Sequence, residues 1–284
     1  MDWLKNWNEA LDCLEKNLDG TISLEELSRL AGCSAYHFQR MFSYLAGVPL
    51  KEYIRRRRMT RAAADLREGE KVLDVALRYG YDSPTAFNRA FQAIHGVAPS
   101  LARQDGVKLK AFPRIRFKFV LKGDAEMEYQ IVKKAAFRIV GLRTSLPADV
   151  EESFQVVPQF WSTAGQRIGE LIPLMVPEMP GVLGVSTCHS EEESYYYIAV
   201  ASDAPVLAGM HEWTVPAATW AVFSGQSKQP MAIQELQKRV VTEWLPDSGY
   251  EWAQAPDVEV YLSAPGTEEQ QFQVWLPIQK ARGK

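Results

Sequence analysis

Apolar residues recur at helical spacing through the first hundred positions of the chain. Trp3, Trp7, Ala10, Leu11 and Leu14 lie three or four residues apart, which predicts an amphipathic first helix. The same periodicity, with Ser at helix starts and Gly at helix ends, predicts five more helices. They run between Ser23 and Gly32, between Ser34 and Gly47, over 50–66, over 72–79, and from Pro84 to Gly96.

Two pairs of these short helices repeat each other on either side of the long helix 50–66. Phe38 and Phe87, and likewise Arg40 and Arg89, are 49 residues apart. A tandem helix-turn-helix is the arrangement that this pattern predicts, and a plain helical bundle is the alternative. Each arginine lies opposite the phenylalanine face of its helix, where it can read guanine in a major groove.

Charge is distributed unevenly along the chain. The net charge of the whole is -3, yet residues 29–110 carry 15 Lys and Arg against 7 Asp and Glu. Residues 111–284 carry 15 against 21. A basic segment on a mildly acidic chain indicates that the first part binds a polyanion and that the second part does not.

Residues 21–103 resemble the DNA-binding domain of the AraC/XylS family of bacterial transcription regulators. The resemblance is carried by Leu24-Glu25-Glu26-Leu27, Phe38-Gln39-Arg40-Met41-Phe42, Gly47-Val48-Pro49, Tyr53-Ile54-Arg55, Val75-Ala76, Gly80-Tyr81-Asp82-Ser83, Phe87-Asn88-Arg89-Ala90-Phe91 and Pro99. It implies binding to double-stranded promoter DNA, with RNA polymerase as a further partner. The positions it implies for base contact are Tyr36, Gln39, Arg40, Thr85, Asn88 and Arg89. Pro84 departs from the family, whose more typical members carry a polar residue there.

The periodicity changes after Pro99. Alternation over 114–121 predicts a strand, and a strand–helix–strand–strand order then occurs twice. Its elements are expected at 137–142, 152–171, 182–186 and 195–201, and again at 220–224, 231–244, 258–262 and 272–278. Two such units give an α+β domain, an antiparallel sheet with two helices on one face. We therefore expect an all-α tandem helix-turn-helix domain over 1–106, a linker and first strand over 107–127, and this domain over 128–284.

The second half resembles the GyrI-like effector-binding domain of multidrug-sensing regulators. The best stretches are Phe137-Arg138-Ile139-Val140-Gly141, residues 243–250, Pro256-Asp257-Val258-Glu259-Val260-Tyr261 and Leu276-Pro277-Ile278. An AraC-like half followed by a GyrI-like half is a known arrangement. The resemblance implies a small hydrophobic ligand, often a cation, as the effector.

Glu259 and Tyr261 alternate with valines and therefore share one face of a strand. A carboxylate among aromatic rings suits an organic cation, through charge pairing and cation–π contact. Trp161, Tyr197, Trp220 and Trp275 complete the expected effector site by their placement. The alternatives are an exposed strand position for Glu259 and ordinary core packing for each aromatic residue.

Other classes of protein are disfavoured by what the sequence contains. Cys13, Cys33 and Cys188 are too few and too scattered for a disulfide framework, which indicates a reducing, cytoplasmic compartment. We expect no membrane span, no metal site and no cofactor, because neither the apolar runs nor the His, Cys and Gly spacings fit one. No catalytic triad order is present, so an enzyme is not expected. Two alternatives for the second half stay open: a hydrolase using Glu259 and Tyr261, and a protein-docking module.

Overall fold

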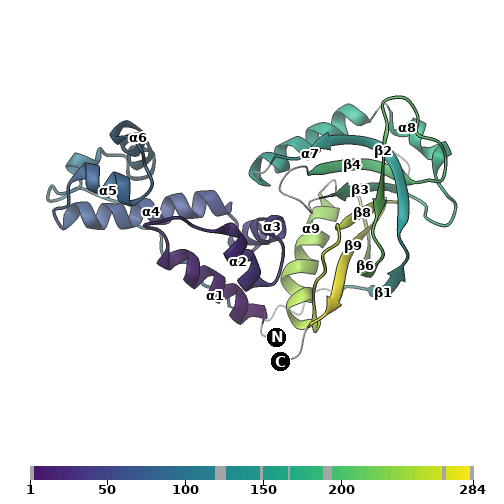
Figure 1. The fold of residues 1–284 in the computed structure, drawn as a ribbon, viewed down its shortest axis with the longest axis horizontal. Helices are drawn as coiled ribbons and strands as arrows, with labels where there is room; N and C mark the ends of the chain where they lie inside the picture. The colour runs from purple at the N-terminus through teal and green to yellow at the C-terminus, as the bar shows by residue number, and fades with distance from the viewer. Residues whose placement is uncertain are drawn as a thin grey trace. The chain divides into compact units, whose positions relative to one another are not determined.

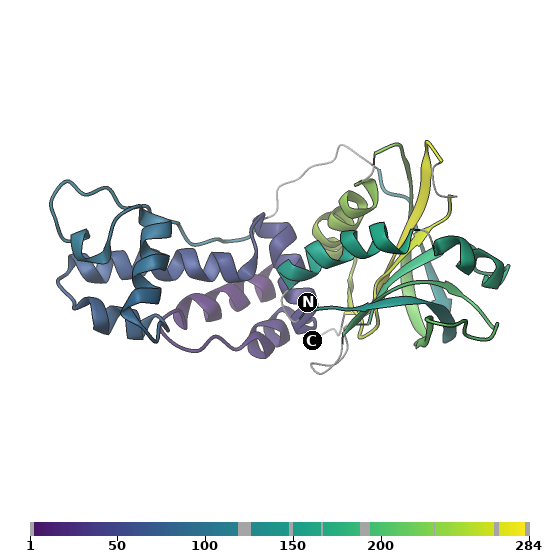
Figure 2. The ribbon, with the colours of Figure 1, turned by 90° about the horizontal axis from the view of Figure 1, so that it is seen from above.

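The computed structural model describes residues 3–118, 126–147, 150–165, 167–187, 194–229, 231–263 and 267–281. The chain divides into two compact units (Figures 1 and 2). The helical unit consists essentially of the described residues up to 118, and the sheet unit of those from 126 onward. None of the helices in these ranges is both long and apolar enough to cross a membrane.

The helical unit contains the predicted helices. They are α1 (Trp3–Lys16), α2 (Leu24–Ala31), α3 (Ala35–Ala46), α4 (Leu50–Arg67), α5 (Val72–Arg78) and α6 (Pro84–His95), with a 3-10 turn at Pro99–Leu101. Local chemistry sets the boundaries as expected. The Ser83 hydroxyl accepts a hydrogen bond from the Ala86 N–H at 3.1 Å at the start of α6. Gly96 ends that helix with a φ of 77°, a conformation that other residues rarely adopt.

A buried ion pair joins α1 to α4. Glu15 is only 3 % exposed, and its two carboxylate oxygens accept hydrogen bonds from Nε and Nη2 of Arg57, each at 2.8 Å. The Tyr53 hydroxyl donates to the same carboxylate at 2.6 Å. Burial raises the pKa of Glu15, but the hydrogen bonds and charges of these partners outweigh it and hold the pKa below its ordinary value.

Other arginines of α4 also contact the rest of the helical unit. Arg58 donates to the backbone oxygens of Leu18 and Gly20, and Arg61 donates to that of Glu15. Together with Arg57, these side chains tie α1 and the turn after it to α4. Part of this run of basic residues therefore stabilises the helical unit through hydrogen bonds within it.

The segment 107–118 corrects a sequence expectation. The described part of the predicted strand 114–121 forms no strand, and residues 119–121 lie outside the described residues. The chain is extended there, but side chains of the helical unit satisfy its backbone: Asn8 exchanges two hydrogen bonds with Phe117, and the Tyr53 hydroxyl accepts from the Ile115 N–H. Phe117 also packs edge-on against Trp7, with ring centroids 6.0 Å apart. The alternation of apolar and polar residues in this segment arises because one side of the extended chain packs on the helices.

His95 gives the helical unit a pH-dependent stability. Its Nε2 lies 3.0 Å from the Met59 carbonyl oxygen, and its Nδ1 accepts a hydrogen bond from the Lys110 N–H, which requires that Nδ1 carry no proton. Burial and then the charge of Lys110 hold the pKa of His95 below its ordinary value, although the Met59 carbonyl raises it. Below a pH of about 6.5, His95 is protonated in the unfolded chain to a greater extent than in the folded unit, so the stability of the folded unit falls as the pH falls.

Replacing His95 with glutamine should reduce this pH dependence. Between pH 7.5 and 5.5, the midpoint of thermal unfolding should shift less for His95→Gln than for the natural chain. Equal shifts in the two proteins would contradict this role of His95.

The sheet unit is built from antiparallel strands in the order β1-β6-β9-β8-β3-β4-β2-β5, with β7 paired to β9. The strands are β1 (Tyr129–Lys134), β2 (Phe137–Ser145), β3 (Val182–Ser186), β4 (Tyr195–Ala201), β5 (His211–Val215), β6 (Ala218–Ser227), β7 (Tyr250–Trp252), β8 (Val258–Tyr261) and β9 (Gln270–Lys280). The helices are α7 (Val150–Ala164), α8 (Ile168–Leu171) and α9 (Ala232–Arg239), with 3-10 turns at Ile172–Leu174 and Leu245–Asp247 and a π-helical turn at Val240–Trp244. The predicted helix 152–171 is thus divided in two.

The duplicated order predicted from the sequence is present. β2, α7, α8, β3 and β4 form one copy, and β6, α9, β8 and β9 form the other; the two meet where β3 pairs with β8. The strand that precedes each copy in the chain pairs with the other copy. β1 precedes the first copy and pairs with β6 of the second, and β5 precedes the second copy and pairs with β2 of the first. Three strands are absent from the predicted order: β1 and β5, which are its two end strands, and β7, which pairs with β9 outside the order.

The two faces of the sheet bury different side chains. On one face, α7 and α8 cover Tyr196 and Ile198, while α9 covers Phe272 and Val274; Tyr261 packs against both groups and places them on the same face. The other face buries a separate cluster that includes Val258, Val260, Tyr197, Trp220 and Trp275. We call these the helix face and the opposite face.

Candidate functional site

Glu259 lies on the helix face, at the centre of the sheet, inside a small group of aromatic residues. The hydroxyls of Tyr196 and Tyr261 both donate to its Oε2, each at 3.0 Å. Trp161 on α7 donates its indole N–H to the Tyr196 hydroxyl, also at 3.0 Å, and its ring lies 4.7 Å from that of Tyr261. One carboxylate is thus surrounded by three aromatic rings, and we call these four residues the Glu259 cluster.

Gly184 makes room for this arrangement. It pairs directly with Glu259 across the β3–β8 junction, where the two copies of the fold meet. A Cβ atom at this position would overlap the Tyr196 hydroxyl and lie 3.0 Å from Glu259 Oε2. The hydrogen-bonded pair therefore occupies the space that any other residue at position 184 would fill with its side chain.

The electrostatics of the cluster keep both tyrosines neutral. Burial, followed by the charge of Glu259, raises the pKa of Tyr196 well above its ordinary value. The same two causes raise the pKa of Tyr261. Neutral phenols donate hydrogen bonds but bring no positive charge, so the negative charge of an ionised Glu259 is not cancelled by them. Together with the rings, that charge is suited to an organic cation.

Only part of the expected effector site comes together. Glu259, Tyr261 and Trp161 meet as expected, but Tyr197, Trp220 and Trp275 lie in the cluster of the opposite face. Trp220 and Trp275 pack there with ring centroids 6.0 Å apart. Because the sheet separates the two faces, these three residues cannot contact a ligand that sits on Glu259.

Two residues of the site were not predicted from the sequence: Tyr196, which belongs to the Glu259 cluster, and Gly184, which makes room for it. The sequence offers three consecutive tyrosines at 195–197, and only the pairing register decides which of them shares a face with Glu259. Alternation along β8 alone cannot supply that register. Gly184 within a buried strand was an available signal, since a glycine there often marks a close approach by another group.

The two expected recognition helices differ in how they present their side chains. On α6, Thr85 and Arg89 are exposed and Asn88 is half-buried. On α3, Tyr36 and Gln39 are half-buried, whereas Arg40 is buried and its Nε donates to the Tyr44 hydroxyl at 3.2 Å. Arg89 can therefore reach a base in its present conformation. Arg40 would first have to break its hydrogen bond to Tyr44 in the same helix.

Arg89 is expected to contribute more to base recognition than Arg40. Arg89→Ala should weaken binding to a selected DNA site by about 1–3 kcal/mol and relax the preference at one base pair. Arg40→Ala should cost less. A gel-shift competition with single-base variants of the site measures both effects, and Arg67→Ala on exposed α4 surface is the control. Unchanged base preference in Arg89→Ala would contradict this placement of α6.

The described ranges contain no group of three or more His, Cys, Asp or Glu residues placed to hold a metal ion. Cys188 and His189, the nearest approach to such a pair in the sequence, lie outside the described residues.

Comparison with known proteins places both units. A family model described as a GyrI-like small molecule binding domain matches residues 127–279, and one described as a helix-turn-helix domain matches residues 27–105. The transcriptional activator AarP of Providencia stuartii is 41 % identical over 97 residues, which are 34 % of this chain and 72 % of that protein. The right origin-binding protein of Escherichia coli K12 is 30 % identical over 207 residues, which are 69 % of this chain and 68 % of that protein.

A third relative is the transcriptional regulator Rob of Salmonella typhimurium, which is 33 % identical over 158 residues, 54 % of either chain. The GyrI-like match covers more than half of the present chain, and the helix-turn-helix match falls on the helical unit. The chain belongs to the AraC/XylS family of DNA-binding transcription regulators and carries a GyrI-like small molecule binding domain in its second half.

Proposed function

We propose that this regulator binds a hydrophobic organic cation at the Glu259 cluster and changes transcription from its promoters in response. The observation that carries the proposal is one carboxylate held by two neutral tyrosine hydroxyls under a tryptophan ring. Placing a carboxylate among aromatic rings costs solvation, so a half-buried Glu259 in these surroundings supports a role in binding.

The chemistry of the cluster selects positive charge on an apolar ligand. A cation over the rings of Trp161, Tyr196 or Tyr261 gains a cation–π interaction, and Glu259 supplies an opposite charge at short range. An uncharged molecule of the same shape gains only the apolar contact. α7 covers the cluster at the point where Trp161 packs on Tyr261, so the Trp161 ring is the part of α7 that such a ligand would meet.

DNA recognition is assigned to α3 and α6, which enter successive segments of the major groove on one side of promoter DNA. The exposure of Thr85 and Arg89 on α6 supports this assignment. RNA polymerase is the further partner, which a regulator of transcription reaches once it is bound at a promoter. We place this activity in the cytoplasm.

Of the two alternatives for the second half, the hydrolase is the weaker. The curated relatives are transcription regulators, and the tyrosines beside Glu259 have raised pKa values, which suits hydrogen-bond donors better than bases. A docking module would use an exposed surface, whereas Tyr196 in the cluster is only 4 % exposed.

Transcription in a purified system tests the proposal. A DNA site selected from a random pool is placed upstream of a promoter, and transcript yield is measured with bacterial RNA polymerase and increasing (1-pyrenylmethyl)trimethylammonium. The natural chain should change the yield with the cation, in either direction, and Glu259→Gln should bind the same DNA but respond only at higher concentration. A response that is identical in the two proteins would overturn the assignment of the effector to Glu259.

A further inference from the structure

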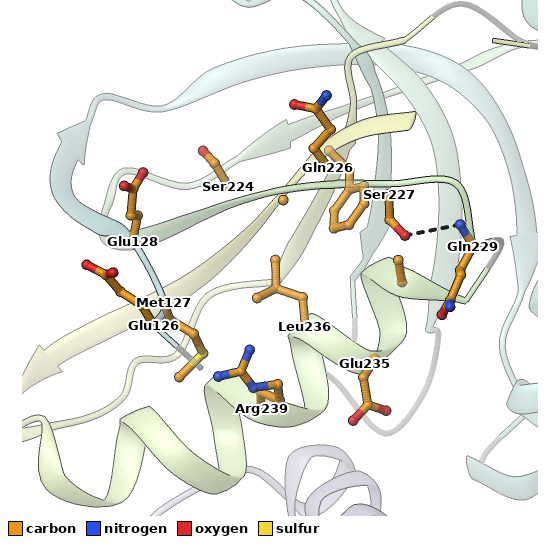
Figure 3. Close-up of a pocket in the computed structure, with 13 residues that line it drawn as sticks. Glu126, Met127, Glu128, Ser224, Gln226, Ser227, Gln229, Glu235, Leu236 and Arg239 are labelled. Atoms are coloured by element: carbon orange, nitrogen blue, oxygen red, sulfur yellow. Dashed lines mark hydrogen bonds between the residues drawn. The ribbon is translucent and has the colours of Figure 1, made fainter. Parts of the chain in front are cut away.

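A cavity with a volume of about 500 Å³ lies beside α9 in the sheet unit (Figure 3). Its walls are α9, the end of β6 and residues 126–128, which lead into β1. The apolar part is formed by buried Phe272 with half-buried Leu236 and Met127. None of the four residues of the Glu259 cluster lines it, so the two sites are separate.

Three exposed carboxylates stand around this apolar patch. Figure 3 shows Glu126 and Glu128 on one side of the cavity and Glu235 on the other, with Leu236 between them. Within the described part of the chain, none of these three carboxylates has an ion-pair or hydrogen-bond partner. The guanidinium of Arg239 also lines the cavity, but its Nε is paired with Glu243 at 3.0 Å. The cavity thus carries an excess of negative charge on two opposite sides of an apolar floor.

We propose that this cavity binds an elongated amphiphilic diamine or oligoamine, in addition to the cation at the Glu259 cluster. The apolar chain of such a ligand covers Phe272, Leu236 and Met127, which removes apolar surface from water. Its two ammonium groups reach the carboxylates at opposite sides, Glu128 with Glu126 and Glu235. Both parts are required: a short diamine lacks the apolar contact, and a diol of full length lacks the charges.

The cavity includes the first described residues of the sheet unit. Residues 126–128 form one wall, and only the seven positions 119–125 separate them from the end of the described helical unit. The apolar part of the cavity also adjoins the proposed effector site, because Phe272 belongs to the apolar group against which Tyr261 of the Glu259 cluster packs. A ligand here contacts residues 126–128 and Phe272, which is a neighbour of the first site.

Calorimetric titration of the full chain with 1,10-diaminodecane tests the proposal. Glu128→Gln combined with Glu235→Gln should weaken binding at least tenfold. Glu178→Gln combined with Asp203→Asn removes the same charge from exposed positions of the sheet unit outside the cavity, and it should leave affinity within twofold. Glu259→Gln should also leave diamine affinity within twofold, which separates this proposal from that of the first site.

Two matched probes test the ligand class. 1,4-Diaminobutane has the same charges with a shorter chain, and 1,10-decanediol has the same length without charge; each should bind at least tenfold more weakly than 1,10-diaminodecane. The proposal is overturned if the natural chain fails to bind the long diamine at millimolar concentration, or if either probe binds equally well. It is also overturned if the cavity variant binds like the control variant, or if Glu259→Gln alone removes diamine binding.

Discussion

Replacing Arg57 with alanine should lower the free energy of unfolding of the helical unit by about 3–5 kcal/mol, because it removes the two charged hydrogen bonds to the buried carboxylate of Glu15. Glu15 is 3 % exposed and the Arg57 side chain is 12 % exposed, so water cannot replace the lost contacts without opening the structure. The substitution also removes the hydrogen bond from Arg57 to the backbone oxygen of Phe112, which holds the extended segment 107–118.

Urea unfolding followed by circular dichroism at 222 nm measures this loss. Arg55→Ala is the matched control, since Arg55 pairs with Glu52 at the surface with 46 % of its side chain exposed, and a surface pair contributes about 0–1 kcal/mol. Combining Arg57→Met with Glu15→Gln removes both charges and should cost less than Arg57→Ala alone. A double variant that is less stable than Arg57→Ala would show that the buried charge is not the cause.

Gly184→Ala should destabilise the sheet unit by about 2–4 kcal/mol, through overpacking and the loss of a buried hydrogen bond. The added methyl group would overlap the Tyr196 hydroxyl, which lies between the Trp161 indole N–H and Glu259. The tyrosine ring must then move away from both partners. The expected result is a lower unfolding midpoint, together with weaker binding of an aromatic cation.

Gly169→Ala is the control for this substitution. Gly169 lies in α8, and a Cβ atom there would meet no atom within 4 Å. Alanine is also the better helix former, so this variant should be as stable as the natural chain or more stable. If the two glycine variants unfold at the same urea concentration, the close approach at Gly184 is not a constraint on the fold.

Much of the architecture follows from local patterns. Helical periodicity with Ser and Gly at the boundaries predicts α2 to α6 to within a few residues, and the two copies of the β-α-β-β order are visible as repeated alternation. What fails is the assignment of an isolated extended segment. Residues 114–118 alternate like a strand, yet their backbone is hydrogen-bonded by the side chains of Tyr53 and Asn8, which lie 62 and 109 positions earlier in the chain.

The candidate site, too, follows only in part from local sequence patterns. That Glu259 and Tyr261 share a face follows from the strand period alone. Which of Tyr195, Tyr196 and Tyr197 joins them depends on the register of β4 on β3 and of β3 on β8, which no local pattern contains. A shift of one residue exchanges the faces. Placement along the chain therefore does not show that Tyr197, Trp220 and Trp275 belong to the face opposite Glu259.

The most direct test of the account is the charge selectivity of the Glu259 cluster. Tryptophan fluorescence is titrated with (1-pyrenylmethyl)trimethylammonium and with uncharged 1-pyrenemethanol, for the natural chain and for Glu259→Gln. The account predicts that the substitution weakens binding of the cation at least tenfold, about 1.4 kcal/mol, and leaves binding of the alcohol nearly unchanged. Equal losses for the two ligands, or no loss for either, would contradict the claim that Glu259 selects a cationic effector.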